Sequence, residues 1–153
     1  MRRVAGVLTV VGALWAAPGI AQAATTDLTS GSASYECQIG CGADASWTAH
    51  GTPSDPHGTA RIRLGQLDSR ASVDCVSVVG NRASISGVLE RPTPGLEGPF
   101  YELDLEDNGS PGKVADRMSF GTSRFPVDCT FGTQFTPTFP VSRGNVLVQD
   151  NTP

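Results

Sequence analysis

The sequence predicts an all-β fold, an antiparallel β-sandwich linked by disulfides, with a small closed barrel as the alternative. Roughly eight short segments with alternating or β-branched residues are separated by turn signals, a pattern typical of both architectures. No stretch sustains the apolar period of a helix, so no helix is expected. The chain has 153 residues and four cysteines, and it opens with an export signal, which together favour cross-linking.

Residues 1–23 are typical of a secretory signal peptide. Two arginines precede an apolar run from Val4 to Ala17, and Ala-Gln-Ala at 21–23 fits a cleavage site near Ala23. The run of about 14 residues is shorter than the ~20 that a membrane-spanning helix needs, so no membrane span is expected. The arginine pair is compatible with a twin-arginine signal, but the residues after it favour ordinary secretion. We therefore expect a protein that is secreted or held in the cell envelope.

The remainder of the chain is expected to form one domain with a short leader. Residues 24–34 are mostly Thr, Ser, Gly and Ala with a single leucine, a composition that predicts a flexible lead-in. Residues 35–150 are then expected to form a single β-sandwich domain, since about 130 residues suit one hydrophobic core.

The first half of this domain is expected to contain two hairpins. Residues 45–50 and 59–64 predict strands on either side of a loop at 51–58, and 65–70 has the composition of a turn. Residues 71–79 predict a strand whose apolar parity changes near Cys75, which indicates either a bulge or burial of both faces. After a turn at Gly80-Asn81, the strict alternation in residues 83–89 predicts the returning strand.

The second half contains the clearest strand pattern. In residues 100–106, Tyr and Leu alternate with Glu and Asp, and an Asp-Asn-Gly turn leads to renewed alternation at Met118 and Phe120. Apolar residues recur at 127, 129 and 131. The proline-rich residues 132–143 predict a flap whose phenylalanines cover one end of the core, and residues 146–149 predict a last strand.

The charge of the chain argues against nucleic acid. Removing residues 1–23 takes away two arginines and no acid, so the formal net charge goes from −4 to −6. The remaining basic residues do not cluster in the sequence, whereas a phosphate backbone requires a basic footprint. An anionic membrane surface is disfavoured for the same reason.

The four cysteines allow three disulfide pairings. Val-Asp-Cys occurs twice, ending at Cys75 and at Cys129, and this similarity favours a Cys75–Cys129 bridge. Cys37 and Cys41 would then close a short local ring. A zinc site made by all four is disfavoured, because Cys75 and Cys129 lack the paired short spacing of zinc knuckles.

Four segments together resemble the post-COAP domain, a secreted module of actinobacteria. They are Ala45–Ala49, Gly80–Gly87, Asp107–Gly112 with Asp116, and Arg143–Gln149. The resemblance covers about residues 45–150, and Asp-Asn-Gly-x-Pro-Gly followed by Asp is its most specific part. It implies a secreted β module and no particular activity. The chain departs from the family pattern in the loop at 91–99 and in its four cysteines.

An acidic cluster is a candidate calcium site. It consists of Glu106, Asp107, Asn108 and Asp116, whose carboxylate and amide oxygens are the ligands that calcium prefers. The spacing is not that of an EF-hand. The favoured interpretation is that Asp107 and Asn108 cap the turn, while the acids of residues 102–106 form the solvated face of an edge strand. No cofactor is predicted other than this possible calcium.

Enzymatic chemistry is disfavoured. His50, Asp55 and His57 lie in one predicted loop, but no serine sits in a nucleophile-type turn. Carbohydrate binding through Trp47, Tyr101, Phe135 and Phe139 is an alternative, although strand positions usually bury such rings. We expect a non-catalytic extracellular module with a structural or interaction role and an unknown extracellular or cell-wall partner. The alternative is a calcium-dependent or carbohydrate-binding module.

Overall fold

The computed structural model of the chain describes residues 26–36, 42–65, 67–91, 96–109 and 115–151. These residues form two antiparallel five-stranded sheets. Sheet A has the strand order β10-β1-β2-β3-β4, and its members are β1 (Asp27–Glu36), β2 (Gly42–Thr52), β3 (Asp55–Leu64), β4 (Leu67–Ser72) and β10 (Arg143–Gln149). Sheet B has the order β5-β6-β7-β8-β9, and its members are β5 (Cys75–Val79), β6 (Arg82–Val88), β7 (Phe100–Glu106), β8 (Arg117–Ser123) and β9 (Phe139–Pro140).

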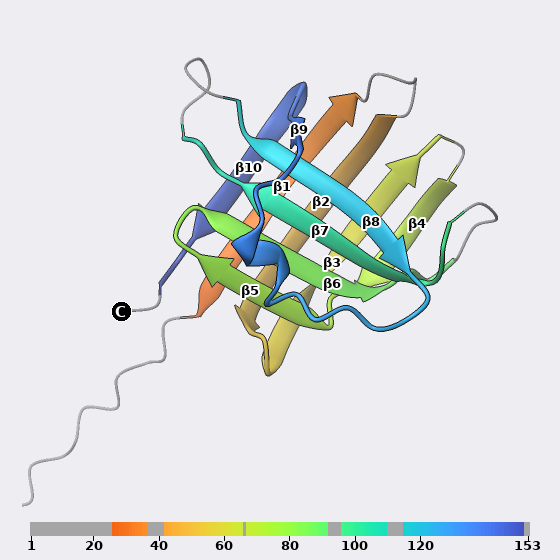
Figure 1. The fold of residues 1–153 in the computed structure, drawn as a ribbon, viewed down its shortest axis with the longest axis horizontal. Coiled ribbons are helices and arrows are strands. Elements are labelled where there is room, and N and C mark those ends of the chain that lie inside the picture. Colours follow the sequence, from red (N-terminus) through yellow and green to blue (C-terminus); the bar gives the residue numbers. More distant parts are fainter. Residues whose placement is uncertain (1–25, 37–41, 66, 92–95, 110–114, 152–153) are drawn as a thin grey trace, which may run out of the picture.

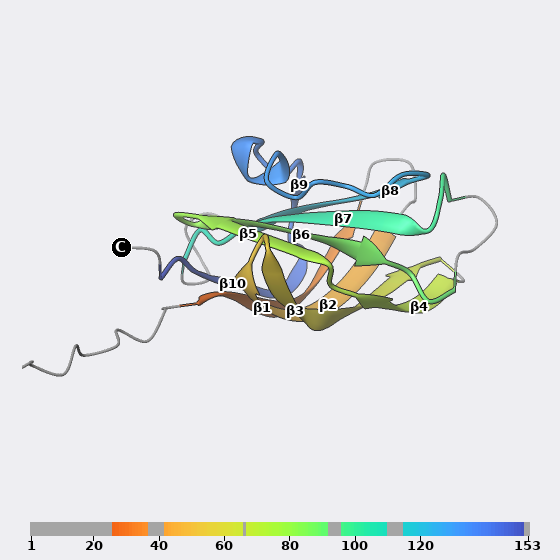
Figure 2. The same cartoon turned by 90° about the horizontal axis from the view of Figure 1, so that it is seen from below.

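The two sheets lie face to face as separate layers, and their strands cross when viewed from above (Figures 1 and 2). Each sheet has its own two edge strands, so the predicted sandwich is confirmed and the alternative of a closed barrel is wrong. The sheets are built largely from sequential antiparallel neighbours, and only β10 returns from the end of the chain to pair with β1.

The core lies between the sheets and is unequal on its two sides. Sheet B contributes large side chains, such as Ile85, Leu103 and the fully buried Tyr101. Sheet A contributes many alanines around Trp47, whose Nε1 donates a hydrogen bond to Thr29 Oγ1 at 3.0 Å. The small residues of sheet A leave room for this indole, since a Cβ at Gly31 would lie 2.8 Å from it.

The prediction of a flexible lead-in at 24–34 is wrong over residues 27–34. These residues belong to β1, which pairs with β2 on one side and with β10 on the other. The β-sandwich domain therefore begins before residue 35. The composition misled the prediction because Ser, Gly and Ala are weak strand formers, and here the strand is stabilised by two neighbours.

The hairpin of β2 and β3 is longer than predicted. The expected loop at 51–58 is wrong over most of its length, because β2 continues to Thr52 and β3 starts at Asp55. Gly51 and Gly58 have φ values of 119° and 154°, and these conformations, which other residues rarely adopt, keep the ladder intact around a tight connection. Residues 67–72, predicted as mainly a turn, form β4.

The change in the alternation of apolar residues near Cys75 marks the point where the chain crosses from sheet A to sheet B. Strand β4 ends at Ser72 in sheet A and β5 begins at Cys75 in sheet B, so the expected continuous strand is broken at Val73-Asp74. The residues on either side then face the same core from opposite layers. Gly87 permits this passage, because a Cβ there would overlap the backbone carbonyl of Ser72.

Residues 124–138, which we call the strap, cross the outer side of sheet B. Figure 2 shows the strap and its short helix η1 (Gly132–Gln134) on the side of sheet B that faces away from sheet A. The apolar residues at 127, 129 and 131 therefore lie outside any strand. The predicted covering of the core by flap phenylalanines is confirmed for Phe139, whose ring stacks on Tyr35 at 4.8 Å, and is wrong for Phe135, which is 65% exposed.

Candidate functional site

The predicted calcium ligands lie at the end of the β7–β8 hairpin, where two of them, Asp107 and Asp116, bind backbone amides of the opposite sheet. Asp116 is buried, and its two carboxylate oxygens accept hydrogen bonds from the amides of Asn108 and Val146, each at 2.9 Å. Asp107 accepts from the amides of Gly109 and Val148, at 2.8 and 3.1 Å. Because Val146 and Val148 belong to β10, these two carboxylates link the sheets.

The other two members of the cluster have local partners. Glu106 Oε2 lies 3.3 Å from Arg82 Nε, and Asn108 Nδ2 donates to the carbonyl of Ala115 at 3.0 Å. Within the described ranges, no group of three or more His, Cys, Asp or Glu side chains could hold a metal ion. The arrangement matches the turn-capping interpretation, and in addition Asp107 and Asp116 join the two sheets through hydrogen bonds. Calcium binding stays a prediction.

The Cys75–Cys129 disulfide is present, with a Cα–Cα distance of 5.8 Å. The pairing is as predicted, but the cysteines do not meet in the core. Cys75 lies opposite Ser86 on the outward parity of sheet B, so the bridge fastens the strap to the outside of β5. Cys37 and Cys41 lie outside the described residues, and their pairing stays a prediction.

The outer face of sheet B contains two carboxylates under the strap. Glu102 and Asp104 were predicted on the solvated face of an edge strand, but β7 is the central strand of sheet B and η1 packs over it. Asp104 Oδ1 is buried without a hydrogen-bond partner, while the Ser84 hydroxyl donates to Glu102 Oε1 at 3.2 Å. Burial raises the pKa of Asp104. Burial, and after it the nearby charge of Asp104, raises the pKa of Glu102.

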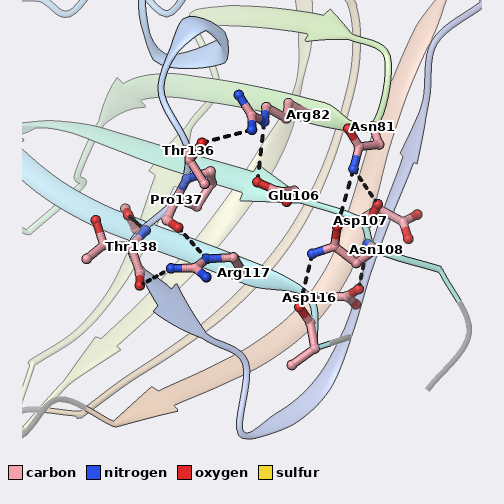
Figure 3. A network of polar contacts seen from close by, with 12 residues as sticks. Asn81, Arg82, Glu106, Asp107, Asn108, Asp116, Arg117, Thr136, Pro137 and Thr138 are labelled. Atoms are coloured by element: carbon pink, nitrogen blue, oxygen red, sulfur yellow. Dashed lines mark hydrogen bonds and ion pairs between the residues drawn. The ribbon is translucent and has the colours of Figure 1, made fainter. Parts of the chain in front are cut away.

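Polar contacts fasten the strap at both ends over these carboxylates. Arg117 donates from Nε to the carbonyl of Pro137 at 2.7 Å and from a terminal nitrogen to that of Thr138 at 2.8 Å, and Arg82 donates to Thr136 Oγ1 at 2.8 Å (Figure 3). At the other end, Ser86 donates to the carbonyl of Val127 at 2.8 Å. The outer face of sheet B is therefore occupied by the chain itself.

The histidines of the β2–β3 hairpin are exposed. His50 and His57 are cross-strand partners with ring centroids 5.5 Å apart, and His57 Nε2 lies 3.3 Å from Asp55 Oδ1. The side chains of His57 and Asp55 are 58% and 82% exposed. This arrangement gives an acid–base pair no enclosed site for a substrate.

The aromatic residues considered for sugar stacking do not form a common platform. Trp47 and Tyr101 are buried, as their strand positions predicted, and Tyr101 donates its hydroxyl to the carbonyl of Ser72 at 3.1 Å. Phe139 is stacked on Tyr35, which leaves Phe135 exposed on the strap. Binding through this set of rings therefore has no geometric support.

The outer face of sheet A is open and hollowed, and sequence reasoning missed it as a site. A hollow of about 410 Å³ extends across four strands of the sheet. Its lining side chains are polar or charged apart from two alanines, and they are Ser32, Ser34, Asp44, Ser46, Arg61, Arg63 and Arg143. A second hollow of about 540 Å³ adjoins it and shares Ser46 and Arg61.

The register of sheet A explains how distant residues meet in this hollow. Arg143 lies opposite Ser34, Ser34 opposite Asp44, and Asp44 opposite Arg63. Four strands thus place one row of polar side chains on the same outward parity. The available signal was the alternation of serines with Gly and Ala in residues 30–34, but it lay in the segment predicted to be a flexible lead-in.

No protein-family model, curated protein or solved structure matches the chain. The resemblance to the post-COAP domain stays a prediction. In the part of the chain that the structure describes, no helix is long and apolar enough to cross a membrane.

Proposed function

We propose that this protein is a secreted or cell-envelope module without catalytic activity, which binds an extracellular or cell-wall partner through the outer face of sheet A. The observation that carries the proposal is the open, hollowed state of this face, because the corresponding face of sheet B is covered by the strap. Sites of recognition are usually concave and carry a few convergent polar groups.

Other features support the extracellular and non-catalytic parts of the proposal. The apolar N-terminal run favours export, and a disulfide that joins residues 54 positions apart is compatible with an oxidising compartment. The exposed His50–His57 pair offers no enclosed environment in which a general base could act on a bound substrate. A rigid sheet that presents polar groups is suited to binding.

Retention on cell-wall fragments of the producing organism tests the proposal. Ser46 lines both hollows, so Ser46→Trp should fill them and abolish retention of the exported protein. Val79→Trp is the matched control, because Val79 is 60% exposed at the edge of sheet B and should tolerate the same ring. Equal retention of the two variants, or no retention of the unaltered protein, would overturn the proposal. Equal melting temperatures would confirm that both variants fold.

A further inference from the structure

The hollow on sheet A has a floor of short side chains and walls of arginine. Ser32, Ser34 and Ser46 lie on β1 and β2, which run under the middle of the hollow. Arg63 and Arg143 come from β3 and β10, which border it on either side. These arginines are three strands apart, which corresponds to roughly 14 Å between their backbones at the usual spacing of about 4.8 Å. The hollow is therefore longer than a single sugar ring.

The arginines differ in how much of their hydrogen-bonding capacity is used. Arg61 binds Asp68 through two hydrogen bonds of 2.7 and 2.5 Å, so its charge is largely matched. Arg63 lies at 3.5 Å from the same carboxylate. Arg143 has no ion-pair partner among the described residues. Arg63 and Arg143 thus retain N–H groups that can bind a ligand carboxylate in a fork.

The hollow also contains an acceptor. Asp44 lies between Ser34 and Arg63 in the cross-strand row, and the Ser34 hydroxyl donates to its Oδ1. A carboxylate here favours ligands that carry hydroxyl donors and repels a chain of phosphates, which has none. Because its lining includes no aromatic side chain, the hollow offers no stacking surface for a neutral sugar and no apolar anchor for a protein.

We propose that this hollow binds an acidic polysaccharide, with the sugar carboxylates on Arg63 and Arg143 and the sugar hydroxyls on Asp44 and the serines. The inference rests on the proposed function and specifies the class of partner. Charge complementarity supports it. The two cross-strand rows of outward side chains that pass through the hollow, one containing Ser34 and the other Ser32, carry four arginines and two aspartates, namely Arg61, Arg63, Arg70, Arg143, Asp44 and Asp68. This local excess of positive charge contrasts with the formal net charge of −4 of the chain.

Calorimetric titration of the exported protein with three polymers tests the inference. Polygalacturonate should bind, its methyl ester should bind at least about tenfold more weakly because the carboxylates are masked, and polyphosphate should bind weakly. The double variant Arg63→Gln/Arg143→Gln should lose at least about tenfold in affinity for polygalacturonate. The control Arg91→Gln/Arg124→Gln makes the same charge change at two exposed positions outside the hollow and should lose less than about threefold.

Asp44→Asn sharpens the test, since it should improve polyphosphate binding and keep most of the affinity for polygalacturonate. Equal binding of polygalacturonate and polyphosphate by the unaltered protein would overturn the inference, as would equal losses in the two double variants. Absence of polygalacturonate binding would also overturn it. If cell-wall retention were still lost in Ser46→Trp, the proposed function would survive with a different partner.

Discussion

The two sheets treat their outer faces in opposite ways. The outer face of sheet A is open to solvent, and arginines outnumber acidic residues in the cross-strand rows that line its hollow. The outer face of sheet B instead holds Glu102 and Asp104 beneath the strap. Burying carboxylates costs free energy, so the cover over sheet B must be held by other contacts. The disulfide and the two arginines that bind the strap supply them.

This difference separates the roles of the two faces. A polar face that is already hydrated needs no cover, and short serine side chains on sheet A leave its surface hollowed. The strap uses its own backbone carbonyls to bind the side chains of sheet B, which leaves that face with little capacity for a ligand. We therefore expect changes on sheet B to alter stability and changes on sheet A to alter binding.

Removing the disulfide should have the largest effect. Cys75→Ala/Cys129→Ala opens a loop with a sequence separation of 54, so about 4 kcal/mol of the free energy of unfolding should be lost. Urea denaturation measures the loss, and hydrogen exchange should locate the first increase in exchange in the strap. A loss under about 1 kcal/mol would mean that the remaining contacts hold the strap without the bridge.

A side chain at position 132 should have the next largest effect. A Cβ there would overlap Asp104 Oδ1, Ser84 Oγ and Glu102 Oε1, so Gly132→Ala should displace the strap and cost about 1–3 kcal/mol. Alanine is more favourable than glycine in a helical turn, so without the overlap Gly132→Ala would raise the free energy of unfolding. A decrease in that free energy therefore points to the overlap. Gly121→Ala is the control, because nothing lies within 4 Å of a Cβ at that exposed position. Equal stability of the two variants would contradict close packing of the strap.

The carboxylates under the strap should give stability a specific dependence on pH. Glu102 and Asp104 have raised pKa values when folded, so the folded state binds more protons and stability falls as pH rises above their ordinary values of 4.5 and 3.8. Asp104→Asn should reduce this fall and stabilise the protein at neutral pH. Asp128 has a lowered pKa because the Thr130 hydroxyl and amide donate to it, so its contribution is lost instead as pH falls. Thermal melts between pH 3 and 8 distinguish the variants, and identical pH profiles would contradict the prediction.

The sequence was a good guide where one strand carries its own pattern. The alternation in residues 100–106 predicted β7, and repeated Val-Asp-Cys favoured the observed disulfide. It was a poor guide where structure depends on distant neighbours. Strand β1 lacks β-branched residues apart from Thr29 and exists between β2 and β10. The strap packs its helix η1 over β7, although the two are far apart in the sequence. The hollow was missed for the same reason, since Ser34, Arg63 and Arg143 meet only through strand register.

Removal of two arginines from sheet A should have the smallest effect on stability. Arg63 and Arg143 border an open hollow, and the ion pair that Arg63 makes with Asp68 of β4 joins two exposed side chains, a kind of pair that contributes little to stability. Arg63→Gln/Arg143→Gln should therefore change the free energy of unfolding by less than about 0.5 kcal/mol, as exposed substitutions usually do. Urea denaturation of this variant beside Gly132→Ala measures the contrast directly. A loss as large as that of Gly132→Ala would assign the arginines to the architecture of sheet A. Near-wild-type stability together with lost polygalacturonate binding would assign them to recognition, because the same substitution would then separate folding from binding.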